Sequence, residues 1–350
     1  DRGEVMTTAA YAAMSAGAPL ESYAIERRSL RSHDVCIDIA YSGICHSDIH
    51  QAREEWFTSL FPMVPGHEIA GVVCDVGSDV TKLTVGDRVG VGVFVETCME
   101  CDNCTAGLEN YCVKGFVPTY NGKSYDGEMM YDGYSSSIVV DDHYVLRIPD
   151  SLVLDVAAPL LCAGITTYSP LREWEAGPGK RVGIMGLGGL GHMGVKHAVA
   201  MGADVTLISH SPSKEADAKR LGAHDFLLLS DRDAMKERAM TFDLIVNTVS
   251  ASIALDPVIN LLATDGTMAY VGLPDKPLEM NIFGLNSQRR RIAGSNIGGI
   301  RETQEMLDFC AEHGYGSDIE VIEAAQINEA WERVVNSDVR YRFVIDATTF

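Results

Sequence analysis

From about residue 180 onward, short apolar segments alternate with helix-like stretches, and this alternation restricts the possible fold more than any other feature. Strands that alternate with helices of about 10 to 15 residues form parallel βαβ units, which assemble into a doubly wound sheet. The residues before about 150 differ, because short β segments there are separated by Gly, Pro and Asp turns. We therefore expect an α/β chain whose first half is mostly β. The predicted strands are 35–41, 69–76, 182–185, 205–209, 226–229, 244–249, 267–272 and 341–346.

A glycine-rich turn with the sequence GLGGLG follows the strand 182–185 and opens a helix. In that context the G-x-G-x-x-G pattern indicates dinucleotide binding. Gly186 permits the tight turn, Gly188 lets a pyrophosphate approach the backbone, and Gly191 allows close helix packing. The helix N-terminus offers unpaired N–H groups and the positive end of its dipole to the phosphates. The residues assigned to the dinucleotide by this turn are Gly186, Gly188, Gly189, Leu190 and Gly191.

The end of the second strand of such a fold selects between the two nicotinamide cofactors. A carboxylate there binds the ribose hydroxyls of NAD and repels the 2′-phosphate of NADP. Here the strand ends in the sequence SHSPSK, which contains no acid. Ser209 stands where the acid would be, and Ser211 and Lys214 are potential donors to a phosphate. A helix N-cap with a solvated lysine is the structural alternative, and it is compatible with the prediction of NADP.

Four cysteines lie within 15 residues, in the spacing Cys98-x2-Cys101-x2-Cys104-x7-Cys112. Four thiolates in one loop suit a closed, tetrahedral zinc site, which stabilises a fold and leaves no position for a substrate. The alternatives are an iron-sulfur cluster and a set of buried free cysteines. We predict structural zinc, in a lobe over 96–114.

A catalytic zinc would need three protein ligands and one exchangeable position. The remaining candidates are Cys45, His67 and Cys162, which lie too far apart in the sequence to meet except by folding. Taken singly, each is more often a packed core residue than a ligand. Their surroundings are distinctive, because they occur in the motifs GICHSD at 43–48, PGHE at 65–68 and LCAG at 161–164.

Together with the cysteine lobe, GDRV at 86–89 and YRFVID at 341–346, these motifs resemble the zinc-dependent medium-chain dehydrogenases. The resemblance is strongest to the cinnamyl alcohol dehydrogenase branch and its bacterial NADP-dependent relatives, and it covers nearly the whole chain from about Thr8. It implies a GroES-like catalytic domain over 1–155, a Rossmann NADP-binding domain over 156–291, and a return to the catalytic domain over 292–350.

The resemblance also implies the roles of individual residues. Cys45, His67 and Cys162 become the ligands of the catalytic zinc. Glu68 becomes an alternate fourth ligand that exchanges with water, and Asp48 becomes the carboxylate that orients the ligand histidine. For both acids, an ordinary solvated or turn carboxylate is the structural alternative.

Further residues receive roles from the same resemblance. Ser47 and His50 resemble a proton relay that links the substrate to water, although a turn serine and a surface histidine would look the same. Trp56 and Phe94 are expected to face the substrate, or else to belong to the core. The strand end that contains Ser295 and Ile297 is expected to touch the nicotinamide ring.

The implied activity is hydride transfer between NADP(H) and a primary alcohol or aldehyde, of cinnamyl, benzyl or medium-chain type, mainly as aldehyde reduction. The implied cofactors are two zinc ions per chain and NADP. Family members pair through their cofactor domains, so we expect a homodimer or homotetramer. A zinc-free reductase and a non-catalytic cofactor-binding protein of the same fold are the alternatives.

The formal charge of -21 and a pI of about 4.8 disfavour nucleic acid and anionic membranes as partners. They also disfavour a zinc-bearing nucleic-acid regulator, the third alternative, because the densest basic run, 289–291, is only three residues long. No apolar stretch approaches the ~20 residues that span a bilayer. We expect a cytoplasmic protein, with Met6 as its natural start and residues 1–5 added at expression.

Overall fold

The computed structural model describes residues 6–350, so residues 1–5, proposed above to precede the natural start, lie outside the described residues. It divides into two compact units. The first unit comprises the described residues up to Cys162 together with Gly298–Phe350, and the second is Ala163–Ile297. The sequence places the domain borders slightly earlier, after 155 and 291. No helix within 6–350 is long and apolar enough to cross a membrane.

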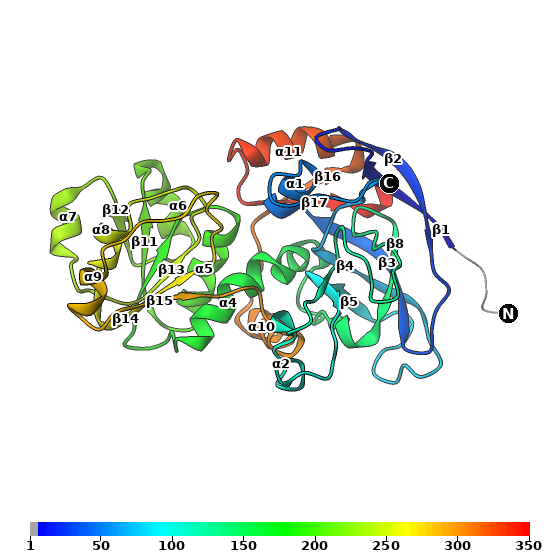
Figure 1. Cartoon of the computed structure of the whole chain (residues 1–350), viewed down its shortest axis with the longest axis horizontal. Helices are drawn as coiled ribbons and strands as arrows, with labels where there is room; N and C mark the ends of the chain where they lie inside the picture. The colour runs from blue at the N-terminus through cyan, green and yellow to red at the C-terminus, as the bar shows by residue number, and fades with distance from the viewer. Residues whose placement is uncertain (1–5) are drawn as a thin grey trace. The chain divides into compact units, whose positions relative to one another are not determined.

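The second unit is built on a six-stranded parallel sheet with the strand order β12-β11-β10-β13-β14-β15 (Figure 1). The order reverses direction between β10 and β13, which defines the switch point of a doubly wound sheet, where ligands bind at the carboxyl ends of the strands. Its strands are β10 (Arg181–Met185), β11 (Asp204–Ser209), β12 (Asp225–Leu228), β13 (Phe242–Asn247), β14 (Leu262–Tyr270) and β15 (Arg291–Gly294). Its helices are α4 (Ala163–Glu173), α5 (Gly189–Ala200), α6 (Glu215–Arg220), α7 (Arg232–Glu237), α8 (Leu255–Ile259) and α9 (Ile282–Asn286).

The first unit contains a mixed sheet with the order β16-β17-β3-β4-β5-β9, and β8 pairs with β3. All of its pairings are antiparallel except that of β16 with β17. The strands of this sheet are β3 (Asp34–Gly43), β4 (Ile69–Val76), β5 (Arg88–Val91), β8 (Ser137–Asp141), β9 (Leu146–Arg147), β16 (Ile319–Glu323) and β17 (Arg342–Asp346). Two small ribbons pair β1 (Met6–Ala13) with β2 (Leu20–Arg27), and β6 (Phe94–Glu96) with β7 (Val117–Pro118). The helices are α1 (His46–Ala52), α2 (Asp102–Thr105), α3 (Leu154–Ala157), α10 (Ile300–His313) and α11 (Ile327–Val335).

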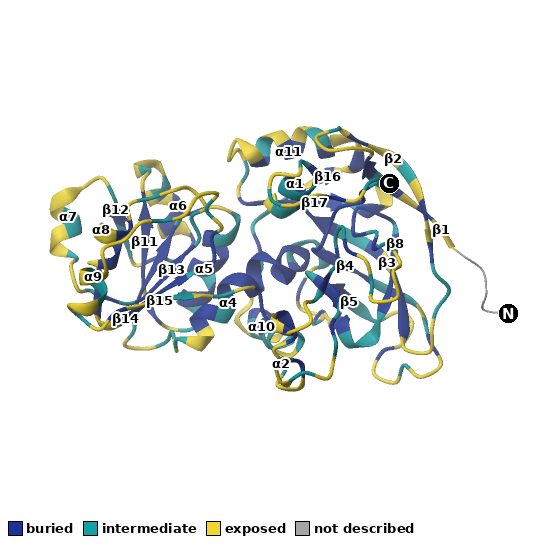
Figure 2. Cartoon of the chain, viewed as in Figure 1, coloured by how far each residue is buried: buried dark blue, intermediate teal, exposed yellow. Residues whose placement is uncertain are grey.

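The core of the first unit is built from strands in which buried and more exposed side chains alternate. Figure 2 shows the buried residues of these strands in dark blue. Val35, Ile37 and Ile39 project from one face of β3 into a cluster of buried apolar side chains, as the two-residue period of a strand requires. Helix α11 contributes to a second cluster through an apolar stripe at helical spacing. The buried residues of that stripe are Ile327, Ala330, Trp331 and Val334.

Candidate functional site

Three predicted zinc ligands from distant parts of the chain meet in the first unit. Cys45 caps the N-terminus of α1, His67 precedes β4, and Cys162 follows a short 3-10 helix. Together with Glu68 they form a buried group whose potential ligand atoms all lie within 4.8 Å of one another. The Cys45 and Cys162 sulfurs are 3.9 Å apart. Two sulfurs bound tetrahedrally at about 2.3 Å from zinc would lie about 3.8 Å apart, so this spacing fits the metal.

The wholly buried carboxylate of Asp48 connects two of these ligands. Its Oδ2 accepts a hydrogen bond from the Cys45 backbone N–H at 3.1 Å. Its Oδ1 accepts from the Gly66 backbone N–H at 2.9 Å and lies 3.0 Å from His67 Nδ1. Because Nδ1 is bound in this way, Nε2 is the ring nitrogen available to a metal, as the predicted orienting role of Asp48 requires.

The electrostatics of the group favour a positive charge at its centre, which can be supplied by a proton on His67 or by a metal ion that displaces that proton. Burial lowers the pKa of His67, but the charge and hydrogen bond of Asp48, with a further contribution from Cys45, raise it to about 10. The pKa of Cys45 is held well below its usual value by a hydrogen bond from Cys162 and, despite burial, by Arg342 and His67. Cys45 is therefore poised as a thiolate, the form that binds zinc.

The two carboxylate oxygens of Glu68 have different surroundings. Oε1 forms an ion pair with the buried Arg342 on β17. Oε2 is buried and has no hydrogen-bond partner among the described residues. A buried acceptor without a donor is costly, so an exchangeable cation or water would satisfy it. This geometry suits the predicted alternate ligand.

Glu68 also packs over Gly43, the last residue of β3. A Cβ at position 43 would lie 2.9 Å from Glu68 Cβ and 3.0 Å from Glu68 Cδ, closer than side chains approach. The glycine thus leaves the space that the carboxylate occupies. The sequence reasoning assigned no role to Gly43 or Arg342, although an arginine directly before the apolar run FVI signals a buried charge in need of a partner.

The predicted relay serine lies beside the ligands. Ser47 Oγ is 3.6 Å from the Cys45 sulfur, and it is a hydrogen-bond partner of the Tyr120 hydroxyl. The Tyr120 ring stacks on His67, with centroids 4.4 Å apart and an interplanar angle of 30°. Burial, with Asp48 and the two thiols nearby, raises the pKa of Tyr120, so its hydroxyl keeps its proton. No sequence motif marks Tyr120, which was missed.

The remaining predicted relay residue, His50, and the predicted pocket residues Trp56 and Phe94 pack against different aromatic or charged neighbours. His50 stacks on Trp56 with centroids 4.5 Å apart, and its Nδ1 is a hydrogen-bond partner of the Glu55 carboxylate. Phe94 is only 3% exposed and packs against Phe116, with centroids 5.4 Å apart. Trp56 therefore lies beside the relay histidine, whereas Phe94 is surrounded by aromatic packing.

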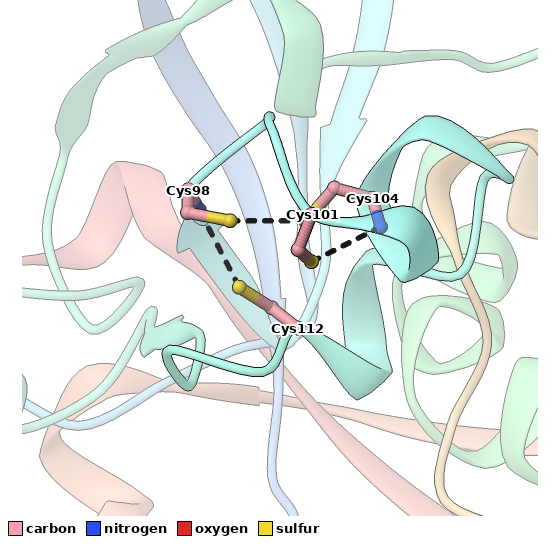
Figure 3. A group of neighbouring side chains, drawn as sticks. All are labelled: Cys98, Cys101, Cys104 and Cys112. Carbon is pink, nitrogen blue, oxygen red and sulfur yellow. Dashed lines mark hydrogen bonds between the residues drawn. The ribbon is translucent and has the colours of Figure 1, made fainter.

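The four cysteines of the lobe also converge, as Figure 3 shows. The Cys98 and Cys104 sulfurs are 3.9 Å apart, the same tetrahedral spacing as at the first centre. The backbone N–H of Cys104 donates to the Cys101 sulfur, and that of Cys98 to the Cys112 sulfur, each at 3.5 Å. Backbone donors from Cys104 and Val113 lower the pKa of Cys101 to about 6. The loop thus presents thiolates for a metal with no exchangeable position.

Glu109 ties this lobe to the start of α10. Its buried carboxylate accepts a hydrogen bond from the Ile300 backbone N–H at 3.1 Å and lies 3.0 Å from His143 Nε2. Arg301 donates to the Ala106 carbonyl at 2.9 Å. Because a carboxylate at a helix N-terminus satisfies N–H groups that lack partners, the lobe and the helix stabilise each other.

The glycine turn of the second unit has the geometry that a pyrophosphate needs. Gly186 adopts a φ of +91°, which favours glycine. A Cβ at Gly191 would collide with the carbonyl of Gly186, so the helix and the turn pack without space for a side chain. At Gly188, by contrast, no described atom lies within 4 Å of the Cβ position. That residue leaves open room at the N-terminus of α5 for phosphate oxygens.

The predicted selectivity and nicotinamide residues lie at the carboxyl ends of strands. Ser209 ends β11 and is buried, and its Oγ accepts a hydrogen bond from the Ser211 backbone N–H at 3.1 Å. Lys214 lies in the following 3-10 helix. Ser295 follows β15, where its N–H donates to Tyr270 O at 3.2 Å, and Ile297 is buried with a φ of +42°.

Comparisons with known proteins agree with this architecture. A family model described as "Alcohol dehydrogenase GroES-like domain" matches residues 31–150, and one described as "Zinc-binding dehydrogenase" matches residues 189–312. The chain is 59% identical over 344 residues to NADP-dependent alcohol dehydrogenase C 1 of Mycolicibacterium smegmatis, covering 98% of this chain and 99% of that protein. It is 53% identical over 349 residues to aldehyde reductase YahK of Escherichia coli, with coverage of 98% and 99%. A solved cinnamyl alcohol dehydrogenase of Sorghum bicolor aligns with a TM-score of 0.95 and 46% identity over 98% of both chains.

A GroES-like β unit with a cysteine-histidine centre, in one chain with a doubly wound dinucleotide fold, defines a zinc-binding dehydrogenase of the medium-chain class. The chain belongs to the zinc-dependent medium-chain alcohol dehydrogenases, in the cinnamyl alcohol dehydrogenase branch. Its activity is that of an NADP-dependent alcohol dehydrogenase, and its cofactors are zinc and NADP. The predicted fold class, enzyme class and cofactors are thereby confirmed.

Proposed function

We propose that this enzyme mainly reduces aromatic or medium-chain aldehydes to primary alcohols with NADPH. The meeting of Cys45, His67 and Cys162 in one buried group carries the proposal. The names of two relatives support the finer assignment, since one is an aldehyde reductase and the other acts on cinnamyl alcohol. The use of NADP also favours reduction in the cell.

In this proposal Cys45, His67 and Cys162 hold the catalytic zinc, and Glu68 is the ligand that exchanges with water. The bound groups supply Lewis acidity that polarises the substrate oxygen, and a hydride from the reduced cofactor. The protein contributes geometry, because Asp48 sets the plane and tautomer of the His67 ring. Arg342 holds one oxygen of Glu68, so only the other is available for exchange.

The product alcohol needs a proton, for which we propose the relay from Ser47 to His50. The Ser47 hydroxyl is the donor nearest the ligands, and Glu55 orients the His50 ring through Nδ1. In the second unit, the turn 186–191 binds the pyrophosphate, while Ser209, Ser211 and Lys214 receive the 2′-phosphate. Ser295 and Ile297 contact the nicotinamide, and the closed cysteine lobe holds the structural zinc.

A matched pair of cysteine variants tests this proposal. Cys162→Ser should lower the catalytic zinc content and reduce kcat/KM for benzaldehyde and cinnamaldehyde by more than about 100-fold. Loss of a residue that only orients a ligand costs about 10- to 100-fold in metal affinity or activity, and loss of a ligand itself should cost more. Cys310→Ser, buried in α10 outside both metal groups, should leave both quantities unchanged. The measurements are metal analysis and initial rates with NADPH and with NADH, and NADPH should be preferred.

Two outcomes would contradict the proposal. A zinc-depleted preparation that reduced the aldehydes at the parent rate would point to the zinc-free reductase. A zinc-loaded parent that turned over no aldehyde in the panel would remove the proposed substrate class.

A further inference from the structure

Tyr120 touches two different parts of the proposed zinc centre. Its ring lies on the His67 imidazole, 4.4 Å between centroids, and its hydroxyl is a hydrogen-bond partner of Ser47. One side chain therefore contacts both a metal ligand and the first residue of the proposed proton relay. None of the roles assigned above includes it.

The backbone on either side of Tyr120 is held in place. The Thr119 N–H donates to the Val93 carbonyl at 2.8 Å. The Asn121 N–H donates to the buried Asp132 carboxylate at 2.9 Å. The Asn121 side chain accepts from the Leu60 N–H at 2.9 Å and donates to the Leu60 carbonyl at 2.6 Å. The position of the aromatic ring is thus set by its two neighbours in the chain, which are hydrogen-bonded to three other residues, and does not depend on the ring's own packing alone.

The contacts of Tyr120 with His67 and with Ser47 each restrict a motion that no other contact described above restricts. Asp48 holds His67 through one in-plane atom, Nδ1, which leaves tilting of the ring to be limited by whatever lies on its face. The Ser47 hydroxyl turns about its C–O bond, and its hydrogen bond with the Tyr120 hydroxyl limits that rotation, so the direction of the serine O–H group is defined. The two restraints act on different atoms and are separable by substitution.

We propose that Tyr120 is a positioning residue of this enzyme, whose ring restrains the metal-binding face of His67 and whose hydroxyl orients Ser47 for proton transfer. The inference rests on the proposed function and adds a residue to it. Removing the hydroxyl alone should disturb proton transfer, and removing the ring as well should also loosen the metal.

Two variants and one control separate the two effects. Tyr120→Phe keeps the ring and loses the hydroxyl, whereas Tyr120→Leu loses both. Tyr23→Phe is the control, because Tyr23 lies on β2, outside both metal groups. The readouts are kcat and KM with NADPH and benzaldehyde, the solvent deuterium isotope effect on kcat, and the rate of zinc release to a chromogenic chelator.

For Tyr120→Phe we expect kcat to fall by about 3- to 10-fold, the span of one hydrogen bond, with KM within about twofold. Its solvent isotope effect should rise because proton transfer becomes slower, and zinc release should match that of the parent. For Tyr120→Leu we expect zinc release to accelerate by about 10-fold or more, as when groups that orient ligands are lost. Tyr23→Phe should match the parent in every readout.

The proposal is overturned if Tyr120→Phe retains the parent kcat and isotope effect while Tyr120→Leu retains the parent zinc release. That result leaves the proposed function intact, provided that the parent reduces aldehydes and Cys162→Ser does not. If Tyr120→Leu fails to fold, the kcat and isotope effect of Tyr120→Phe decide the matter for the hydroxyl, and Tyr120→Met, which removes the ring but fills a similar volume, replaces the leucine variant in the zinc-release measurement.

Discussion

At the scale of single residues, Asp48 shows how one buried carboxylate can serve both folding and metal binding. It accepts from the Cys45 N–H at the start of α1 and also faces His67 Nδ1. The same group therefore closes the first turn of a helix and orients a proposed ligand from another segment. Formation of α1 and formation of the metal centre are coupled through this side chain.

A second buried residue, His197 on α5, makes stability depend on pH. Burial lowers its pKa from 6.5 to about 3, and its Nε2 lies 3.0 Å from the Gly164 carbonyl. The folded protein thus keeps the ring neutral, while the unfolded chain binds a proton below about pH 6.5. The contribution of His197 to stability is complete above that pH and is lost progressively as pH falls toward 3.

We predict that His197→Gln, which preserves a donor, weakens the loss of stability on acidification. Between pH 7 and pH 5 the parent should lose about 2 kcal/mol through this residue, and the variant should not. Urea unfolding of both proteins at the two pH values, followed by fluorescence, provides the measurement. Equal losses of unfolding free energy in the two proteins would show that His197 titrates normally.

At the scale of elements, the cysteine lobe is a loop that the metal must stabilise. It contains one short helix, α2, and one 3-10 turn, and only five of its 19 residues are buried. Few buried apolar groups support it, so its order depends on the four sulfurs and on Glu109 at the start of α10.

We therefore predict that Cys104→Ser chiefly reduces thermal stability. One zinc per chain should be lost, and the melting temperature should fall by several degrees, which corresponds to roughly 2 kcal/mol or more. Activity at low temperature should persist, in contrast to Cys162→Ser. If Cys104→Ser and Cys162→Ser lowered the melting temperature equally and both left activity intact, the division into a structural and a catalytic site would be wrong.

The elements also show how far sequence reasoning reaches. The strand 69–76 was predicted with the bounds that β4 has, and β10, β11 and β13 were predicted within about two residues, because apolar runs bounded by glycine or charge define them. The apolar pattern did not predict β15, because its sequence, RIAG, is short and only partly buried, and only the family resemblance indicated a strand end near Ser295. The motifs indicated the ligands, but the proximity of Arg342 to Glu68 and of Tyr120 to His67 arises from tertiary packing that no local pattern encodes.

At the scale of the whole molecule, the second unit has an edge strand and exposed apolar side chains. β15 lies at the edge of its sheet, and Leu273 and Phe283 are 61% and 76% exposed. An uncovered edge with exposed apolar groups favours association. These features support the expected homo-oligomer.

We predict that light scattering will give a mass of two or four times the 37.9 kDa chain. Phe283→Glu should lower that mass or weaken the association, because it introduces a charge into an apolar contact. Phe57→Glu, at a 71% exposed position in the first unit, is the control and should not change the mass. A parent that is monomeric at all concentrations would exclude the homo-oligomer.

Gly43 has a final consequence for how variants of this enzyme are interpreted. Its backbone is extended and tolerates any residue in principle, yet even an added methyl group would displace the carboxylate that packs over it. If Glu68 has the ligand role proposed above, an alanine at this position should lower activity with little loss of fold, as a substitution of Glu68 itself should. A mutational screen would suggest that position 43 needs glycine for its backbone conformation. The requirement instead comes from the Glu68 side chain, which occupies the volume that a Cβ at position 43 would need.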